Sequence, residues 1–200
     1  MIEVLISNKS NYLLFLICYF IGSIPFGYIF YKIIKKDDIR NHGSGNIGAT
    51  NVNRLIGKKF GFITLFLDFL KTFCPCLIMH KYFGTEVGVV SGFLTILGHI
   101  YPIWLKFKGG KGVAVYVGII LALSFKLAFI FGAIWLIILF LFRYSSLSSI
   151  LASLSLIIYN LFFDNNFQNI FLILFFLIII YTHKQNILRI KDKKETKIKF

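Results

Sequence analysis

The sequence predicts an all-α integral membrane protein with about seven transmembrane helices, its N-terminus outside and its C-terminus in the cytoplasm. Hydrophobic residues make up 58% of the 200-residue chain, which includes 24 phenylalanines. A water-soluble domain of this length cannot bury so many apolar side chains, whereas each spanning helix needs about 20 predominantly apolar residues. Short polar segments separate the apolar runs, and none is long enough to fold alone. We therefore expect a single polytopic membrane domain over residues 1–200.

Seven apolar runs are the expected spans. The first lacks a small-residue cleavage site and is followed by further apolar runs, so we expect an anchor and not a removable signal peptide. Within it, Gly22, Ser23, Pro25 and Gly27 favour a bent, closely packed helix. The fourth and seventh runs are short for a full crossing and are expected to tilt or to lie among neighbouring helices. The expected spans lie near residues 12–34, 60–79, 87–105, 113–125, 127–142, 147–163 and 170–181.

The distribution of basic residues predicts the topology. All but four of the 22 lysines and arginines lie at the end of the first run, as Lys32 does, or follow the first, third, fifth or seventh run, and the exceptions are Lys9, Lys71, Lys81 and Lys126. Basic residues in short loops accumulate on the cytoplasmic side, which places these loops and the basic tail 184–200 there. The formal charge of +14 is then explained by topology and by attraction to anionic lipid. It does not call for nucleic acid.

The segment from Asn41 to Arg54 is the longest polar, glycine-bearing run of the chain. Glycines let backbone N–H groups converge on an anion, and a guanidinium fits phosphate as a fork. A flexible loop built from turn-forming residues is the competing interpretation. The candidate ligands of an anion in this segment are Ser44, Asn46, Thr50, Asn51 and Arg54.

Two further polar clusters are expected on the same cytoplasmic face. In the first, Lys108 and Lys111 stand beside the glycines 109, 110 and 112, which is typical of a phosphate-binding segment but also of a basic turn at a membrane surface. This is not a Walker A loop, because Gly112 stands where Ser or Thr would hold magnesium. In the second cluster, His183 and Asn186 are three residues apart and share a face if the last helix continues. Lys184 and Arg189 accompany them.

Asp68 and Lys71 are the ionisable pair inside the second run. Three residues apart, they lie on one helix face and can pair, which lowers the cost of charge at membrane depth. A functional pair and a structural lock remain equally open, and His99 either contacts a ligand or ends its helix. The three cysteines lie inside expected spans without the spacing of a zinc site, so we expect packing roles and no metal.

Several short motifs, taken together, give the chain a family resemblance. It resembles the bacterial integral membrane acyl-phosphate:glycerol-3-phosphate acyltransferases, the PlsY family, over nearly its full length. One departure is Thr72, where the family usually has glycine. The motifs are Ser23 to Gly27, Gly43 to Arg54, Leu67-Asp68 with Lys71 and Pro75, Gly98-His99 with Pro102 and Phe107 to Ala114, Arg143-Tyr144, and His183 to Ile187.

The resemblance implies transfer of an acyl group from acyl phosphate to the 1-hydroxyl of glycerol 3-phosphate at the cytoplasmic face of the bacterial inner membrane. No cofactor, metal or protein partner is implied. Because the chain offers no Ser-His-Asp relay, we expect direct transfer, with His183 or a substrate phosphate as the base. The residues that the resemblance assigns to catalysis are Ser44, Arg54, Lys111, His183 and Asn186, with Asn46, Thr50, Asn51, Lys108, Gly109, Gly110 and Gly112 at the substrate phosphates.

Two other classes of function compete with the acyltransferase. An organic-anion or phosphate transporter or channel would line its path with Asp68, Lys71 and the glycine segments, although transport sites usually lie near the membrane midplane. A scaffold that recruits anionic partners through its basic tail would lose its function when Lys191 to Phe200 is deleted. We expect that deletion to be mild.

Overall fold

The computed structural model describes residues 9–163 and 168–198, and every regular element in these ranges is a helix. The all-α prediction is confirmed. The chain forms two compact units, Met1–Leu123 and Ser124–Phe200, each of which is considered by itself. The expectation of a single domain stays a prediction. The extreme N-terminus, the link between residues 164 and 167 and the last two residues of the basic tail lie outside the described residues.

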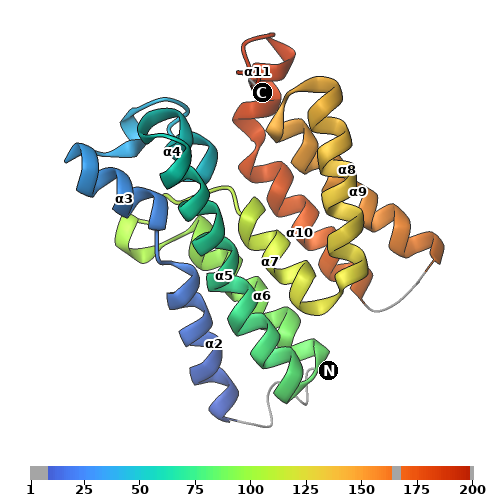
Figure 1. Cartoon of the computed structure of the whole chain (residues 1–200). Coiled ribbons are helices and arrows are strands. Elements are labelled where there is room, and N and C mark those ends of the chain that lie inside the picture. The colour runs from blue at the N-terminus through green and yellow to red at the C-terminus, as the bar shows by residue number, and fades with distance from the viewer. Residues whose placement is uncertain (1–8, 164–167, 199–200) are drawn as a thin grey trace. The chain divides into compact units, whose positions relative to one another are not determined.

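The first unit begins with two helices where one bent helix was expected. Helix α2 (Lys9–Gly22) ends before Pro25, and α3 (Phe26–Lys35) starts after it and turns away from the line of α2 (Figure 1). Proline has no N–H to donate and its ring clashes with the preceding turn, so the helix breaks here. The segment Tyr12–Lys35 is still long and apolar enough to cross a membrane.

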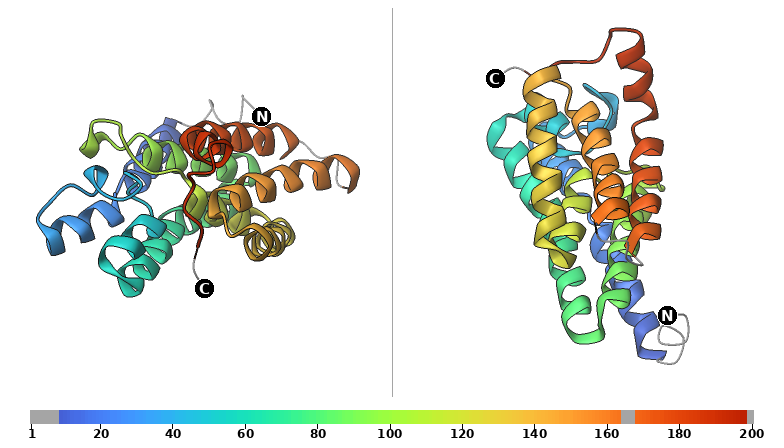
Figure 2. Two further views of the ribbon diagram at one scale, coloured as in Figure 1. Left: turned by 90° about the horizontal axis from the view of Figure 1, so that it is seen from above. Right: turned by 90° about the vertical axis from the view of Figure 1, so that its right-hand side faces the viewer.

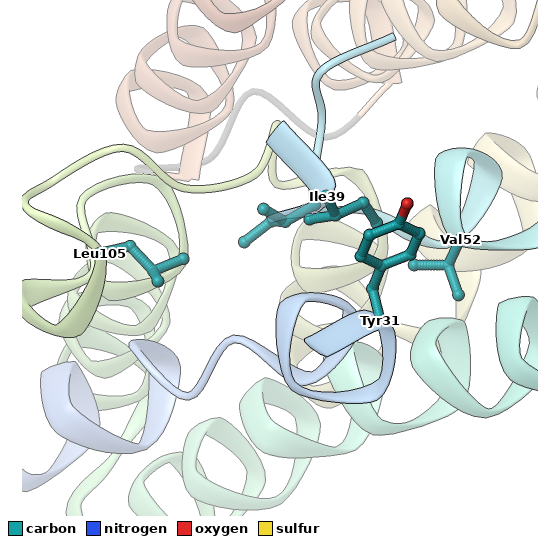
Figure 3. Packing of buried hydrophobic residues seen from close by; sticks show 5 residues of the cluster. Tyr31, Ile39, Val52 and Leu105 are labelled. Atoms are coloured by element: carbon teal, nitrogen blue, oxygen red, sulfur yellow. The ribbon is translucent and has the colours of Figure 1, made fainter. Parts of the chain in front are cut away.

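The polar segment after α3 is anchored by a small apolar cluster. It contains the short 3-10 helix η1 (Ile39–Asn41), the glycine-rich loop and helix α4 (Ala49–Ile56). Figure 3 shows side chains converging from α3, η1, α4 and a second 3-10 helix, η2 (Ile103–Leu105). Burial of this cluster holds the glycine-rich loop against the helices. Its buried members are Tyr31, Ile39, Ile47, Val52 and Leu105.

Helix α5 (Lys58–Phe83) is the centre of the first unit. It packs against α2, α3 and α4, and also against α6 (Thr85–Ile100) and α7 (Val113–Leu123). Helices α2 and α6 approach closely because glycines face the partner backbone: a Cβ on Gly22 would lie 2.2 Å from the carbonyl oxygen of Thr95. Small residues permit such contacts between membrane helices. The expected third span, 87–105, corresponds to α6 followed by the short 3-10 helix η2.

The second unit contains α8 (Phe125–Phe142), α9 (Ser145–Phe163), α10 (Gln168–Thr182) and α11 (Lys184–Lys191). Helix α9 packs against both α8 and α10, as Figure 2 shows on its right. The axes of α10 and α11 differ by 59° across a break at His183. The basic tail expected over residues 184–200 therefore begins with the helix α11.

Five helical segments among the described residues are long and apolar enough to cross a membrane, and a sixth is added if the bent pair α10 and α11 counts as one. Seven were expected. The difference lies in α7, which has 11 residues and ends at Leu123, before the expected end at residue 125. A full crossing needs about 20 residues. The number of spans and the orientation of the termini stay predictions.

Candidate functional site

The glycine-rich loop before α4 is folded around the side-chain amide of Asn51. Asn51 is 1% exposed; its Oδ1 accepts a hydrogen bond from the Ser44 N–H (3.0 Å). Its Nδ2 donates to the carbonyl oxygens of His42 (3.1 Å) and Asn46 (2.9 Å). Gly43 has φ +60°, and a Cβ there would lie 2.3 Å from Asn51 Oδ1. Both amide donors of Asn51 are used within the protein, which favours a role in shaping the loop, and its contact with a substrate phosphate stays a prediction.

Arg54 and Thr50 lie four residues apart on α4 and therefore share a face. Both side chains are exposed, and the Arg54 guanidinium forms no hydrogen bond or ion pair with any residue that the structure describes. Ser44 and Asn46 are half-buried in the loop that leads into this helix. A guanidinium presents five donors in a planar fork that matches phosphate. The exposed face of α4 and the loop before it thus offer a cation and neutral donors to an anion.

The neighbouring arginine, Arg40, is engaged differently. Its Nε and Nη2 donate to the Asp38 carboxylate at 3.0 and 2.6 Å, and its Nη1 donates to the Leu105 carbonyl (3.1 Å). The hydrogen bonds from Arg40 hold the pKa of Asp38 below its usual value. Arg40 therefore joins the loop to η2, and its charge is compensated. The charge of Arg54 is not.

The second glycine segment is tied to the end of α6. The N–H groups of Gly109 and Gly110 donate to the carbonyl oxygens of Ile100 (2.9 Å) and His99 (3.0 Å). A Cβ on Gly110 would lie 2.1 Å from His99 Nε2, so this glycine is required by the histidine ring. These two N–H groups are already used by the backbone, and the role of Gly109 and Gly110 at a substrate phosphate stays a prediction. The other residues predicted to bind an anion in this segment are the two lysines and Gly112, which has φ +85° just before α7.

Lys108 and Lys111 flank these glycines in different surroundings. The side chain of Lys108 is exposed and that of Lys111 is half-buried. Both precede the first turn of α7, where backbone N–H groups and the helix dipole favour a negative charge. An exposed ammonium at this position adds a mobile positive charge for a phosphate.

Lys71 is the centre of a buried polar network. Its Nζ lies 2.8 Å from Asp68 Oδ1, 2.7 Å from the Ile24 carbonyl oxygen and 3.0 Å from His99 Nδ1. An ammonium group has three donors and no acceptor, so Lys71 donates to the Ile24 carbonyl oxygen and His99 Nδ1 must accept, while Asp68 is its ion-pair partner. The neighbours of Lys71 are thus protein groups. Of the two interpretations left open by the sequence, this geometry favours the structural lock.

Thr72, the departure from the family pattern, lies on the packed side of α5. It is fully buried, and a Cβ on Gly118 of α7 would lie 3.4 Å from the Thr72 Cβ. At this distance the two groups would be in ordinary van der Waals contact, and the buried Thr72 hydroxyl has no hydrogen-bond partner among the described residues. The substitution is accommodated at the contact between α5 and α7.

His183 and Asn186 occupy the junction between α10 and α11. His183 is 3% and Asn186 6% exposed. The carbonyl oxygen of Ile179 lies 2.8 Å from His183 Nδ1, so this nitrogen carries a proton and donates. In the neutral imidazole Nε2 is then the acceptor. The condition under which these two residues would share one helix face is not met, because the chain bends at His183 between α10 and α11.

A carboxylate from the tail lies beside Asn186. Glu195 accepts hydrogen bonds from Asn186 Nδ2 (2.5 Å), Ser146 Oγ (2.9 Å) and Arg189 Nε (2.8 Å). Sequence reasoning missed Ser146, which is one of several serines near the start of α9 and carries no distinguishing signal. Glu195 lies within the segment Lys191 to Phe200, whose deletion was expected to be mild. The fold of the tail brings the four residues together.

The predicted catalytic residues are divided between the two units. Ser44, Arg54 and Lys111 lie in the first unit, and His183 and Asn186 lie in the second. Among the residues that the structure describes, no group of three or more His, Cys, Asp or Glu side chains is placed to hold a metal ion.

Comparison with known proteins gives one consistent family. The family model for glycerol-3-phosphate acyltransferase matches residues 12–193. A glycerol-3-phosphate acyltransferase of Pelagibacter ubique is 46% identical over 98% of both chains, and that of Anaplasma marginale is 40% identical over 90% of this chain and 91% of its own. Crystal structures of PlsY, an integral membrane glycerol 3-phosphate acyltransferase, also match over 96% of both chains. Its glycerol 3-phosphate form has a TM-score of 0.90 at 41% identity, and its lysophosphatidic acid form 0.87 at 39%.

Proposed function

Because the chain belongs to the family of PlsY-type integral membrane glycerol-3-phosphate acyltransferases, we propose that it transfers an acyl group from acyl phosphate to the 1-hydroxyl of glycerol 3-phosphate. The products are lysophosphatidic acid and inorganic phosphate. The hydroxyl oxygen forms a bond to the acyl carbon, and the bond from that carbon to the phosphate oxygen breaks. Phosphate leaves with the bonding electrons, and a base takes the hydroxyl proton.

The free guanidinium of Arg54 is the observation that supports this proposal most directly. The loop before it is held in shape by Asn51, so the ordering of Ser44 and Asn46 precedes binding. Both proposed substrates carry phosphate, and their mutual repulsion must be overcome. A pre-organised cation and neutral donors lower that cost.

The other residues of the first unit are assigned by charge and position. Lys108 and Lys111 supply positive charge before α7, and Thr50 shares the α4 face of Arg54. An acyl phosphate is already an activated mixed anhydride, so positioning and charge stabilisation are the main tasks of the enzyme. The reaction needs no cofactor in this scheme.

His183 and Asn186 are the proposed contribution of the second unit. With Nδ1 donating to Ile179, Nε2 is the nitrogen of neutral His183 that has the chemistry to accept a proton. A phosphate oxygen of the substrate is the other group with the chemistry to take this proton. If His183 is the base, loss of its imidazole should lower kcat strongly. If a substrate phosphate is the base, the same loss should lower kcat much less.

We propose direct transfer without an acyl-enzyme. In the first unit Ser44 donates its backbone N–H to Asn51, and its hydroxyl contacts no histidine or carboxylate among the residues that the structure describes. A serine nucleophile is weak unless such a base activates it. Rapid quenching with radiolabelled acyl phosphate should therefore leave no label on the protein. A labelled Ser44 would overturn this part of the proposal.

The bacterial inner membrane is the proposed location, with the active site on its cytoplasmic face. The distribution of basic residues supports this orientation. A transporter is less well supported, because the deep charges of Lys71 and Asp68 are satisfied by one another, by Ile24 and by His99. Uptake of glycerol 3-phosphate into proteoliposomes without a lipid product would favour the transporter.

A donor comparison tests the proposed reaction. Purified protein in detergent is given radiolabelled glycerol 3-phosphate with palmitoyl phosphate, palmitoyl-CoA or palmitoyl-acyl carrier protein, and lysophosphatidic acid is measured. The proposal predicts product with palmitoyl phosphate alone. Product only from a thioester would overturn the assignment of the donor.

A further inference from the structure

The carboxylate of Glu195 is surrounded by side-chain donors from three parts of the second unit. Ser146 comes from the first turn of α9, Asn186 and Arg189 come from α11, and Glu195 itself lies in the tail that follows α11. One carboxylate oxygen accepts from Ser146 (2.9 Å) and Asn186 (2.5 Å), and the other accepts from Arg189 (2.8 Å). The arrangement is therefore a complete set of partners for one oxyanion.

The tail delivers this carboxylate by folding back. The N–H groups of Lys194 and Glu195 both donate to the Arg189 carbonyl oxygen, at 2.7 and 3.1 Å. Further along, the Ile198 N–H donates to the Arg143 carbonyl oxygen (2.8 Å). Only 9% of the Glu195 side chain is exposed, whereas Lys193, Lys194 and Thr196 are exposed. The side chain of Glu195 is thus buried, although its neighbours in this basic segment are exposed to solvent.

The donors around Glu195 are not specific for a glutamate. A hydroxyl, an amide and a guanidinium bind phosphate oxygens as readily as carboxylate oxygens. Burial raises the pKa of Glu195, but the hydrogen bonds from Arg189, Asn186 and Ser146 outweigh it and leave the pKa below its usual value. The tail therefore presents an anion at neutral pH, to side chains that include the proposed site residue Asn186.

We infer that Glu195 is a tethered competitor, which occupies an oxyanion-binding set of Ser146, Asn186 and Arg189 and must leave before a phosphate group of substrate or product binds there. The inference rests on the proposed function, because that function is what places a phosphate at Asn186. It makes the C-terminal tail an autoinhibitory segment. Release of the tail frees all three donors at once.

The expected effect is on apparent affinity. When only a fraction of the molecules is competent to bind, the apparent dissociation constant rises by the inverse of that fraction. If the open tail is populated about one tenth of the time, removing the competing charge lowers the apparent constant roughly tenfold. The catalytic step itself should not slow, because Glu195 does not touch the reacting atoms in this scheme.

The test compares Glu195→Gln with Asp192→Asn. Both changes remove one negative charge from the same tail, but Asp192 is exposed and its side chain has no partner among the described residues. For each protein, kcat and the KM values for glycerol 3-phosphate and for palmitoyl phosphate are measured, together with inhibition by inorganic phosphate. We expect Glu195→Gln to lower one of the two KM values or the inhibition constant of phosphate several-fold, with kcat not reduced. The KM value that falls identifies the phosphate with which the tail competes.

A truncation after Asp192 provides a second variant, because it removes the carboxylate together with the backbone contacts of the tail. It should shift the same constant in the same direction as Glu195→Gln. Constants equal to those of the wild type in both variants would overturn the inference. A lower kcat at unchanged KM would also overturn it, by showing that Glu195 holds Asn186 in place for catalysis.

Equilibrium binding keeps the inference separate from the proposed function. Binding of radiolabelled inorganic phosphate and glycerol 3-phosphate to wild type and Glu195→Gln is measured by equilibrium dialysis. Tighter binding to the variant supports the tethered competitor even if the wild type shows no acyl transfer. Acyl transfer by the wild type with equal binding to both proteins would leave the proposed function standing and refute the competitor.

Discussion

The ammonium group of Lys71 lies 2.7 Å from the carbonyl oxygen of Ile24, at the point where the first membrane segment breaks. A carbonyl oxygen next to a helix break loses its partner within the helix. Lys71 supplies that partner from α5 while it also contacts Asp68 and His99. The break between α2 and α3 and the glycine segment near His99 are therefore connected through one buried side chain.

Replacing Lys71 with methionine should strongly destabilise the first unit. The change leaves the Asp68 charge and the Ile24 carbonyl buried without their partner, which typically costs about 3–5 kcal/mol. Thermal unfolding in detergent, followed by circular dichroism, measures the effect. Lys59→Met is the matched control, since Lys59 is exposed at the start of the same helix.

The double variant Asp68→Leu with Lys71→Met sharpens this prediction. It removes both charges, so it should unfold at a higher temperature than Lys71→Met alone. If Lys71→Met were as stable as the wild type, the pair would not be the structural lock described above.

Replacing Asn51 with aspartate should loosen the glycine-rich loop. Aspartate keeps an acceptor for the Ser44 N–H but cannot donate to the carbonyl oxygens of His42 and Asn46. Leaving a buried acceptor unsatisfied costs about 1–3 kcal/mol. Proteolytic cleavage in the loop should become faster, and Asn53→Asp, an isosteric change on the exposed face of α4, should leave the rate unchanged. Equal cleavage of both variants would contradict the role of Asn51.

Replacing Gly110 with alanine should displace the His99 ring. The new Cβ would lie 2.1 Å from His99 Nε2, so the ring or the backbone must move and the contact to Lys71 is disturbed. We expect a lower unfolding temperature and reduced activity. Gly132→Ala is the control, because a Cβ there meets no atom within 4 Å and alanine favours the helix by about 1 kcal/mol. A neutral Gly110→Ala would indicate that this close approach is unimportant.

Replacing His183 with glutamine should distinguish the two proposed bases. Glutamine retains an N–H donor but cannot accept a proton, so kcat should fall about a hundredfold or more if His183 is the base. Lys184→Gln, at the next and exposed position, controls for the local change. A fall of less than about tenfold would assign the proton to a substrate phosphate.

Much of the fold could be predicted from the sequence because apolar runs in a membrane protein report helices directly. The ends of the helices could not, since packing decides them. A bend was expected near Pro25, but the helix is broken there into α2 and α3. Helix α7 is also shorter than its apolar run suggested. The bend at His183 depends on how α11 and the tail fold back, which no local pattern reports.

The candidate site was predicted in part. The sequence identified the polar segments, but it could not distinguish side chains that serve the fold from those left for a ligand. Asn51 and the N–H groups of Gly109 and Gly110 turned out to be used internally, whereas Arg54 is free of partners among the described residues. Ser146 had no signal of its own, because it becomes notable only when Glu195 is beside it.

Phosphate release from palmitoyl phosphate by the wild type, Arg54→Ala and Lys35→Ala tests whether Arg54 binds a substrate phosphate during acyl transfer. Both variants lose one positive charge, but Lys35 is exposed on α3, outside the glycine-rich loop. We predict release that requires glycerol 3-phosphate, a kcat/KM about a hundredfold lower in Arg54→Ala, and near-normal activity in Lys35→Ala. Release that ignores glycerol 3-phosphate, or equal activity of the two variants, would contradict the account.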